Sequence, residues 1–290
     1  MSTGVEMRAA VNAQPEWLAG VAERVGELRF PSARVAFTGC GTSFHAAQTG
    51  GPAVQALEAV LATPDADVLV VVSHEGTTTL SLEAARAFGG PVWAVTALRE
   101  SPLAEIAAEV VLSAPDVEKS WCHTASYTCA VAALAALNSE DVSGLAVDVG
   151  VALAAGGPDA SDHERFVIAG AGRDWPTAQE AALKLREGAF VAAEAHHTEQ
   201  ILHGHLAAID ESVRAFVLLG EGRAAERARD VARALGELGV DTTVLPSLHP
   251  AVDIVPFQLL TLALADRRGV DPDRIRRDDE RWARARAAYE

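Results

Sequence analysis

From about residue 34, short runs of β-branched residues alternate with alanine-rich stretches. Such runs, about five residues long, predict buried strands, and the stretches between them predict helices. Strands that alternate with helices are typical of a parallel sheet covered by helices on its faces. In the first half, the pattern predicts strands at 34–39, 67–73, 91–96 and 109–114, and helical stretches at 43–62, 79–89, 102–108 and 124–155.

The pattern restarts after a Gly-Gly-Pro segment at 156–158, which is the best candidate linker because Gly and Pro interrupt regular structure. The predicted fold class is therefore α/β, with two tandem units, each a parallel sheet in a flavodoxin-like, three-layer arrangement. We expect the domains to be 1–155 and 156–290. In the second half, the pattern predicts strands at 165–170, 213–220 and 241–246, with 251–256 as a further candidate strand, and helices at 175–197, 223–239 and 257–269.

The two halves share a strand–Gly–x–Gly–helix turn. Aligning RVAFTGCGTS (34–43) with RFVIAGAGRD (165–174) superimposes an arginine and both glycines. The elements that follow also come in the same succession. We interpret the halves as two copies of one α/β unit.

Neither turn completes a dinucleotide-binding fingerprint. That motif needs a third glycine three residues after the second, and Phe44 and Trp175 occupy those positions. No Walker lysine follows either turn. NAD is therefore not expected as a cofactor.

The net charge of −16, with a pI near 5.0, repels phosphate backbones and anionic lipids, so neither nucleic acid nor membrane is an expected partner. Three cysteines without paired spacing indicate reduced thiols and a cytoplasmic location. The N-terminus lacks a signal-peptide pattern. The longest apolar run, at 129–137, is too short to cross a bilayer and predicts a buried helix.

Three segments rich in Ser and Thr lie where they can meet at one pocket. GCGTSFH (39–45) and SHEGTTT (73–79) follow strands, and EKSWCHT (118–124) leads into a helix. Ligands of open α/β sheets bind at the carboxyl ends of the strands, and hydroxyl and free backbone N–H groups there can hold an anion. One such loop would be an ordinary helix cap. Three in one half favour a pocket for a polar ligand, although Glu75 is unexpected in an anion-binding loop.

The second half contributes candidate acid–base groups. Glu180, Lys184 and Glu187 share one face of the predicted helix, and a partly buried carboxylate there can move a proton near neutral pH. The alternative is a solvated face of ion pairs. Histidines cluster nearby, but their spacing fits no standard metal motif, so no metal is expected and one histidine is a candidate acid–base group: His196, His197, His203 and His205.

Together these motifs resemble the double-SIS-domain sugar isomerases, above all the isomerase half of glucosamine-6-phosphate synthase. The matching motifs are CGTS (40–43), S-x-x-G-x-T (73–78), ALKLREGAFVAAEA (182–195), HG (203–204) and GVDPD (269–273). The resemblance extends from about residue 30 to 275. It implies two tandem SIS domains and a phosphosugar substrate.

The resemblance also implies a role for each matching residue. Glu187 would move the proton between C1 and C2 of the sugar through an enediol, and Lys184 would help to polarise the site. His203 would assist ring opening from the neighbouring subunit, so a homodimer with shared active sites is expected. The substrate would be held by Gly41, Thr42, Ser43, Ser73, His74, Glu75, Thr78 and His123.

This chain departs from the family pattern at several positions. Glu75 replaces a serine of the middle loop, and His123 and Ala125 replace a Ser and a Lys of the third. The C-terminal lysine of the family, which can form a Schiff base, falls near Asp278. Because a desolvated carboxylate next to a phosphate is costly, either Glu75 points away, or a protonated His74 or His123 offsets it, or the substrate lacks that phosphate.

We therefore expect an aldose–ketose isomerase of a hexose or amino-sugar derivative, with or without phosphate, that needs no cofactor. One alternative is a deaminase or deglycase acting at the same carbon, against which the missing lysine argues. The other is a non-catalytic sugar-sensing module, which would have no need of Glu187 together with His203. No glutaminase domain or N-terminal catalytic cysteine is recognisable, so synthase activity is not expected.

Overall fold

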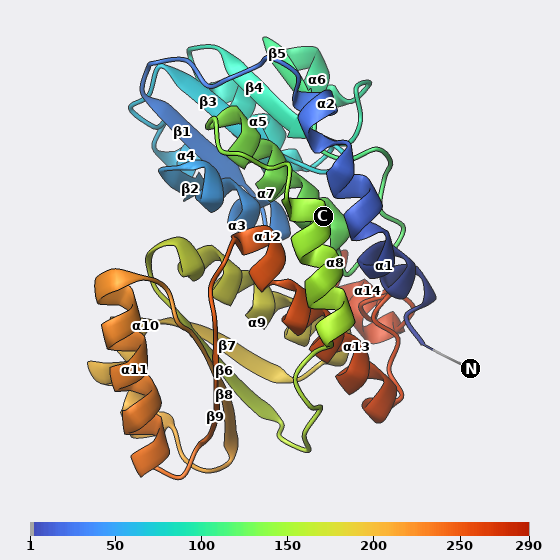
Figure 1. Cartoon of the computed structure of the whole chain (residues 1–290). Helices are drawn as coiled ribbons and strands as arrows, with labels where there is room; N and C mark the ends of the chain where they lie inside the picture. Colours follow the sequence, from blue (N-terminus) through green and yellow to red (C-terminus); the bar gives the residue numbers. More distant parts are fainter. Residues whose placement is uncertain (1–2, 290) are drawn as a thin grey trace.

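The computed structural model describes residues 3–289, and within them the strands form two separate, fully parallel sheets. The first sheet has five strands in the order β2-β1-β3-β4-β5, and the second has four in the order β7-β6-β8-β9. Helices cover both sheets, and α3, α7, α9 and α12 lie between them (Figure 1). The strand order of the first sheet is the flavodoxin-like order 2-1-3-4-5.

The first half begins with two helices that precede the first strand. Its helices are α1 (Val5–Ala19), α2 (Val21–Val25), α3 (Thr42–Gly50), α4 (Ala56–Leu61), α5 (Thr79–Ala87), α6 (Pro102–Ile106), α7 (Ala125–Leu137) and α8 (Leu145–Ala155). Its strands are β1 (Val35–Gly39), β2 (Ala53–Gln55), β3 (Val68–Val72), β4 (Val92–Thr96) and β5 (Glu109–Leu112).

The second half repeats the alternation of strand and helix. Its strands are β6 (Arg165–Gly170), β7 (Ala192–His197), β8 (Val213–Leu218) and β9 (Asp241–Leu245). Its α-helices are α9 (Trp175–Ala189), α10 (Thr198–Leu202), α11 (Gly222–Glu237), α12 (Pro250–Asp253), α13 (Val255–Arg268) and α14 (Glu280–Arg286), and η1 (Gly172–Asp174) and η2 (His205–Ala208) are 3₁₀ helices.

In each half, the second strand, β2 or β7, lies in a stretch that the sequence pattern predicted to be helical. The stretch 43–62 contains β2 because α3 stops at Gly50. Gly50 and the next residue, Gly51, pack against the ring of Phe37. The expected helix 175–197 ends at Ala189, since Phe190 adopts a left-handed φ of 56°, and the alanine-rich segment after it becomes β7. Pairing of β7 with β6 outweighs the helix propensity of alanine.

Two other predictions are corrected. The helical region 124–155 is divided into α7 and α8 by residues 138–144, where Ser139 has a φ of 67°. The candidate strand 251–256 is instead α12 and the start of α13. Pro250 and Pro256 occupy first-turn positions of those helices, which suits a residue without an N–H.

One continuous hydrophobic core joins the two halves. It contains α7, whose residues are all buried, together with strand residues of both sheets and residues of α9 and α13. The start of α1 is held against the segment that follows α13, because the Asp273 carboxylate accepts hydrogen bonds from the backbone N–H groups of Glu6 and Met7. None of the helices within residues 3–289 combines the length and apolar character needed to cross a lipid bilayer.

Each sheet has one point at which the strand order reverses direction. This switch point lies between β1 and β3 in the first sheet and between β6 and β8 in the second. The Gly–x–Gly turns at 39–41 and 170–172 follow β1 and β6, so each turn lies at a switch point. A crevice for ligands is expected at such points.

Candidate active site

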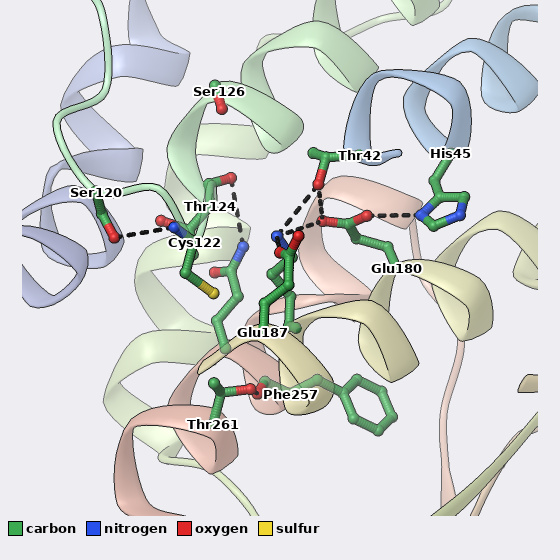
Figure 2. Close-up of polar contacts among 12 residues, drawn as sticks. Thr42, His45, Ser120, Cys122, Thr124, Ser126, Glu180, Glu187, Phe257 and Thr261 are labelled. Atoms are coloured by element: carbon green, nitrogen blue, oxygen red, sulfur yellow. Dashed lines mark hydrogen bonds and ion pairs between the residues drawn. The ribbon is translucent and has the colours of Figure 1, made fainter. Parts of the chain in front are cut away.

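A buried group of charged side chains joins α9 to α3. Lys184 lies at the centre, with Nζ 2.7 Å from Glu187 Oε2, 3.4 Å from Glu180 Oε1 and 3.2 Å from Thr42 Oγ1. Thr42 donates to Glu180 Oε1 at 3.1 Å, and His45 Nδ1 lies 2.7 Å from Glu180 Oε2. We call these five residues the glutamate–lysine cluster (Figure 2).

The spacing of α9 explains this arrangement. Positions i, i+4 and i+7 lie on one helix face, and α9 turns that face toward α3. Glu180 and Lys184 are fully buried, whereas the side chain of Glu187 retains 27% exposure. The prediction that these three residues share a face is confirmed, and the alternative of a solvated face is wrong for Glu180 and Lys184.

Glu180 and Lys184 hold each other in the ionised form. Burial alone would raise the pKa of Glu180, but Lys184, His45 and Thr42 outweigh it, so that pKa is lowered. Burial opposes the charge of Lys184, yet the two glutamates prevail and raise its pKa well above the ordinary value. Lys184 is therefore an ammonium ion that fixes Glu187 in place, not a free amine.

A small pocket with about 270 Å³ of empty space adjoins the cluster. It brings together four of the expected substrate-binding residues from three loops: Thr42, Ser43, His74 and His123. The rings of His74 and His123 are 5.2 Å apart in an edge-to-face arrangement. The prediction that three separated loops meet at one pocket is supported by this lining.

Both pocket histidines are neutral at pH 7. Burial, and then the neighbouring His123, lowers the pKa of His74 to about 4. Burial, followed by the charge of Lys184, lowers the pKa of His123 to about 4. His74 Nε2 accepts a hydrogen bond of 2.9 Å from the Glu118 backbone N–H, which places its own proton on Nδ1. Neither ring therefore supplies the positive charge that would offset Glu75.

The N-terminus of α7 is occupied by a carboxylate of the chain itself. Glu118, which is 5% exposed, accepts hydrogen bonds from the N–H and Oγ1 of Thr124 and from the N–H of Ser126, at 2.7–2.9 Å. The segment 118–124 was expected to offer free N–H groups to a ligand. That expectation is wrong for these amides, because they donate to Glu118, which caps the helix. Within the segment 118–124, His123 lines the pocket.

The loop after β3 has the backbone shape expected of an anion-binding turn. Gly76 has a φ of 67°, and a Cβ there would lie 2.3 Å from Ser101 Oγ, so the position requires glycine. Ser73 is buried, and its Oγ lies 3.5 Å from Thr78 Oγ1 at the start of α5. Glu75 is half-buried, lies outside the lining of the small pocket, and makes no hydrogen bond with the residues described.

His203 lies on the surface, at the end of α10. Its side chain is 69% exposed, and its Nε2 is 2.8 Å from Glu199 Oε1, a carboxylate that also pairs with Arg227. Within one chain, the structure does not bring His203 to the glutamate–lysine cluster. The His196 and His205 rings stack with their centroids 4.3 Å apart. No group of three or more potential ligands in residues 3–289 is placed to hold a metal ion.

The C-terminal segment adds a cation near the small pocket. Arg277 stacks on Trp121, with Cζ 3.6 Å from the ring centroid, and its charge contributes to the lowered pKa of His123, after burial and Lys184. The Arg277 Nε is buried and finds no hydrogen-bond partner among the described residues. Asp278, near which the lysine of the family falls, is instead exposed and paired with Arg274 at 2.6 Å.

Sequence reasoning missed three members of this region. Glu180 was placed on the right face but not in the site, His45 lay inside a quoted motif without a role, and Glu118 was not considered. A signal existed for His45, which follows Thr42 by three residues and so lies on the same side of α3. No sequence signal could show that Arg277 stacks on Trp121.

The amino-acid sequence is similar to a known domain family and to characterised enzymes. A model of the SIS domain matches residues 160–247. The glutamine–fructose-6-phosphate aminotransferase (isomerizing) of Methanothermobacter thermautotrophicus is 27% identical and covers 89% of this chain. That of Sphingobium yanoikuyae is 32% identical over 130 residues, which are 37% of this chain and 83% of that sequence. This chain spans 52% of the length of the Methanothermobacter protein, about half.

Solved structures share the fold at low sequence identity. The C-terminal domain of the Francisella tularensis glucosamine-fructose-6-phosphate aminotransferase aligns with a TM-score of 0.75 at 20% identity, over 92% of this chain and 97% of that one. Thermotoga maritima glucosamine-6-phosphate deaminase aligns with 0.77 at 20%, over 93% and 97%. Escherichia coli tagatose-6-phosphate ketose/aldose isomerase aligns with 0.75 at 17%, over 93% and 95%.

The chain therefore belongs to the SIS-domain family. Within that family, it is homologous to the isomerase domain of glutamine–fructose-6-phosphate aminotransferase. The family model matches one SIS domain, in the second half of the chain.

Proposed function

We propose that the protein is an aldose–ketose isomerase of a hexose or amino-sugar derivative and that Glu187 is its base. The observation that carries the proposal is the position of Glu187, which is 27% exposed and ion-paired at 2.7 Å with a lysine that is itself fully buried. A carboxylate held in one orientation and still open to solvent can reach a substrate proton. The relatives named as isomerases make this chemistry a reasonable expectation for the chain.

In this mechanism, Glu187 removes the proton from C2 of the open-chain aldose. The electron pair forms the C1–C2 double bond of an enediol, and the carbonyl oxygen on C1 takes up a proton. Glu187 then returns its proton to C1 while the C2 hydroxyl loses its own, so the product is an isomer and no other reactant is needed. Lys184 fixes the position of Glu187 throughout, and Thr42 and Glu180 fix Lys184.

The charge state of Lys184 favours isomerisation over the amine chemistry of a deaminase or deglycase. A Schiff base needs an unprotonated amine, and the two glutamates raise the pKa of Lys184 well above the ordinary value even though burial opposes its charge. The C-terminal position of the family's lysine holds an acidic residue here. A sugar sensor without catalytic activity would have no use for a solvent-accessible carboxylate anchored in this way.

We further infer that residues 1–155 form a second, diverged SIS unit beside the unit at 156–290, which contains the matched residues 160–247. The strand orders of the two sheets support this interpretation, because each places its second strand at the edge next to its first. The glycines at equivalent turn positions, Gly41 and Gly172, also have nearly the same φ, 55° and 59°.

Proton exchange in deuterated water tests the role of Glu187. With a sugar that the wild type isomerises, Glu187→Gln is expected to slow exchange at C2 by roughly 10²–10⁴-fold while sugar binding remains, because general-base catalysis is worth about that factor. Glu194→Gln, which changes an exposed carboxylate on β7, is the matched control and should exchange normally. Normal exchange in Glu187→Gln would remove Glu187 as the base.

The exposed position of His203 supports a homodimer in which this histidine completes the partner's site. Co-expression of Glu187→Gln and His203→Ala chains tests that proposal. In a two-fold dimer with shared sites, half of randomly mixed dimers are hybrids with one intact site, so about a quarter of wild-type activity should return. Activity no higher than that of the separate variants would place both residues in a site formed by one chain.

A further inference from the structure

A pocket lies at the switch point of the second sheet, where the proposed chemistry has no role. It has about 550 Å³ of empty space, compared with about 270 Å³ for the small pocket of the first half. We call it the second-sheet pocket. Its polar lining comes from η1, from the loops after β8 and β9, and from α12: Arg173, Asp174, Glu221, Ser247 and Asp253.

This pocket is the internal counterpart of the candidate active site. In the register of the duplicated turn, Gly172 corresponds to Gly41, and both adopt a positive φ. Arg173 then takes the place of Thr42, and Asp174 the place of Ser43. The backbone that shapes a ligand crevice is retained, while the side chains that contact the ligand differ.

The catalytic groups are absent from the counterpart. In the same register, the buried Glu180 of α9 corresponds to Thr49 of α3, which lines a neighbouring pocket that also contains Arg173. Helix α3 stops at Gly50, so it has no positions equivalent to Lys184 and Glu187. A ligand in the second-sheet pocket would therefore be bound but not converted.

Charge decides which ligand the pocket suits. Its wall holds three carboxyl groups, and its one guanidinium, on Arg173, is already 3.4 Å from Glu140. Burial raises the pKa of Asp174, and Glu221 nearby adds to that shift. Burial also raises the pKa of Asp253, to about 7. A phosphate would add to this repulsion, whereas an ammonium group would relieve it.

Hydrogen bonding adds a second requirement. Ser247 Oγ donates to Asp174 Oδ2 at 2.8 Å and accepts from the Gly220 N–H at 2.9 Å, and Asp253 Oδ1 accepts from the Leu248 N–H at 2.9 Å. These contacts hold the Asp174 and Asp253 carboxyl groups in place at the wall of the pocket. Several acceptors around one cavity suit a molecule with several hydroxyl groups.

We propose that the second-sheet pocket binds an amino sugar that carries a free ammonium group and no phosphate. The pocket is a separate ligand site, and its occupancy does not depend on the isomerase activity proposed above.

Isothermal titration calorimetry with glucosamine tests the proposal, with glucose and glucosamine 6-phosphate as comparison ligands. At the second-sheet pocket, glucosamine should bind more tightly than either. Glu221→Lys reverses an exposed charge at the pocket and should weaken glucosamine binding tenfold or more, while Glu237→Lys, at the far end of α11, should leave it unchanged. No glucosamine binding, or equal binding by both variants, would overturn the proposal.

A second pair of variants tests whether binding depends on the space in the pocket and not only on the charge of the protein. Ala224→Trp would fill the pocket and should abolish glucosamine binding, whereas Ala234→Trp, on the same helix but outside the lining, should not. Deuterium exchange at C2 should continue in Glu221→Lys. Loss of glucosamine binding in Glu187→Gln, with normal binding in Ala224→Trp, would assign the amino sugar to the first site and overturn this inference while leaving the isomerase proposal intact.

Discussion

The turns that follow β1 and β6 have the same backbone but different surroundings. At the first, Thr42 joins a buried lysine and glutamate of the other half of the molecule. At the second, Arg173 reaches across to an exposed carboxylate, Glu140, at 3.4 Å. The same backbone turn therefore occurs in both halves, and the side chains that the opposite half supplies give each turn a different charge environment.

The source of the difference is the length of the facing helix. The first crevice faces α9, whose residues Trp175–Ala189 provide two full turns of charged positions beyond the turn itself. The turn after β6 shares a neighbouring pocket with Thr49 of α3, and α3 ends at Gly50 because Gly50 and Gly51 pack against Phe37. Of these two helices, only α9 is long enough to carry charged side chains two turns apart on one face.

The largest expected difference is in how much the protein loses in stability when the cation beside each turn is removed. Lys184→Met leaves Glu180 as a buried carboxylate without its cation, so we expect a loss of about 3–5 kcal/mol in the free energy of unfolding. Arg173→Met breaks an exposed pair and should cost less than about 1 kcal/mol. Urea unfolding at pH 7 measures both. Equal losses would mean that the burial of the cluster does not distinguish the two turns.

A smaller contrast should appear in the pH dependence of stability. Burial is the main cause that lowers the pKa of His74 and His123 to about 4, below the ordinary 6.5. The unfolded chain then binds more protons between those values, so stability is complete above pH 6.5 and falls as the pH drops toward 4. The loss between pH 7 and 5 should be on the order of 1–2 kcal/mol per histidine.

The same urea titrations at the two pH values test this effect. The double variant His74→Gln/His123→Gln should lose part of the difference between pH 7 and pH 5. His249→Gln, in the second half, should lose a smaller part, because burial lowers the pKa of one histidine there instead of two. An unchanged pH dependence in the double variant would mean that these rings are not neutral and buried.

The smallest expected effect concerns Glu75, the acidic residue of the first crevice. Glu75→Ser removes a negative charge beside the expected position of a sugar phosphate, so the affinity for phosphosugars should rise about tenfold, with little change for sugars that lack phosphate. Titration calorimetry with paired sugars measures the ratio. If the variant binds both kinds of sugar as the wild type does, Glu75 points away from the ligand.

Much of the site was visible in the sequence because its residues occur in local patterns. The face formed by Glu180, Lys184 and Glu187 follows from helical spacing, and the turns that carry Thr42 and His74 follow from strand runs that end in Gly, Ser and Thr. The strands β2 and β7 were missed because they are short or rich in alanine, and only pairing with a neighbouring strand makes them extended.

The sequence by itself determined the alternation of strands and helices, the strand–Gly–x–Gly–helix turn common to both halves, and the residue types available for acid–base chemistry, since these depend on neighbours along the chain. Only the tertiary structure decided which charged side chains are buried and which residues they pair with. Glu118 caps α7, His74 and His123 face each other, and Arg277 stacks on Trp121 because segments far apart in sequence pack together. Burial and charge pairing depend on those long-range contacts, which cannot be predicted from the spacing of residues along the chain.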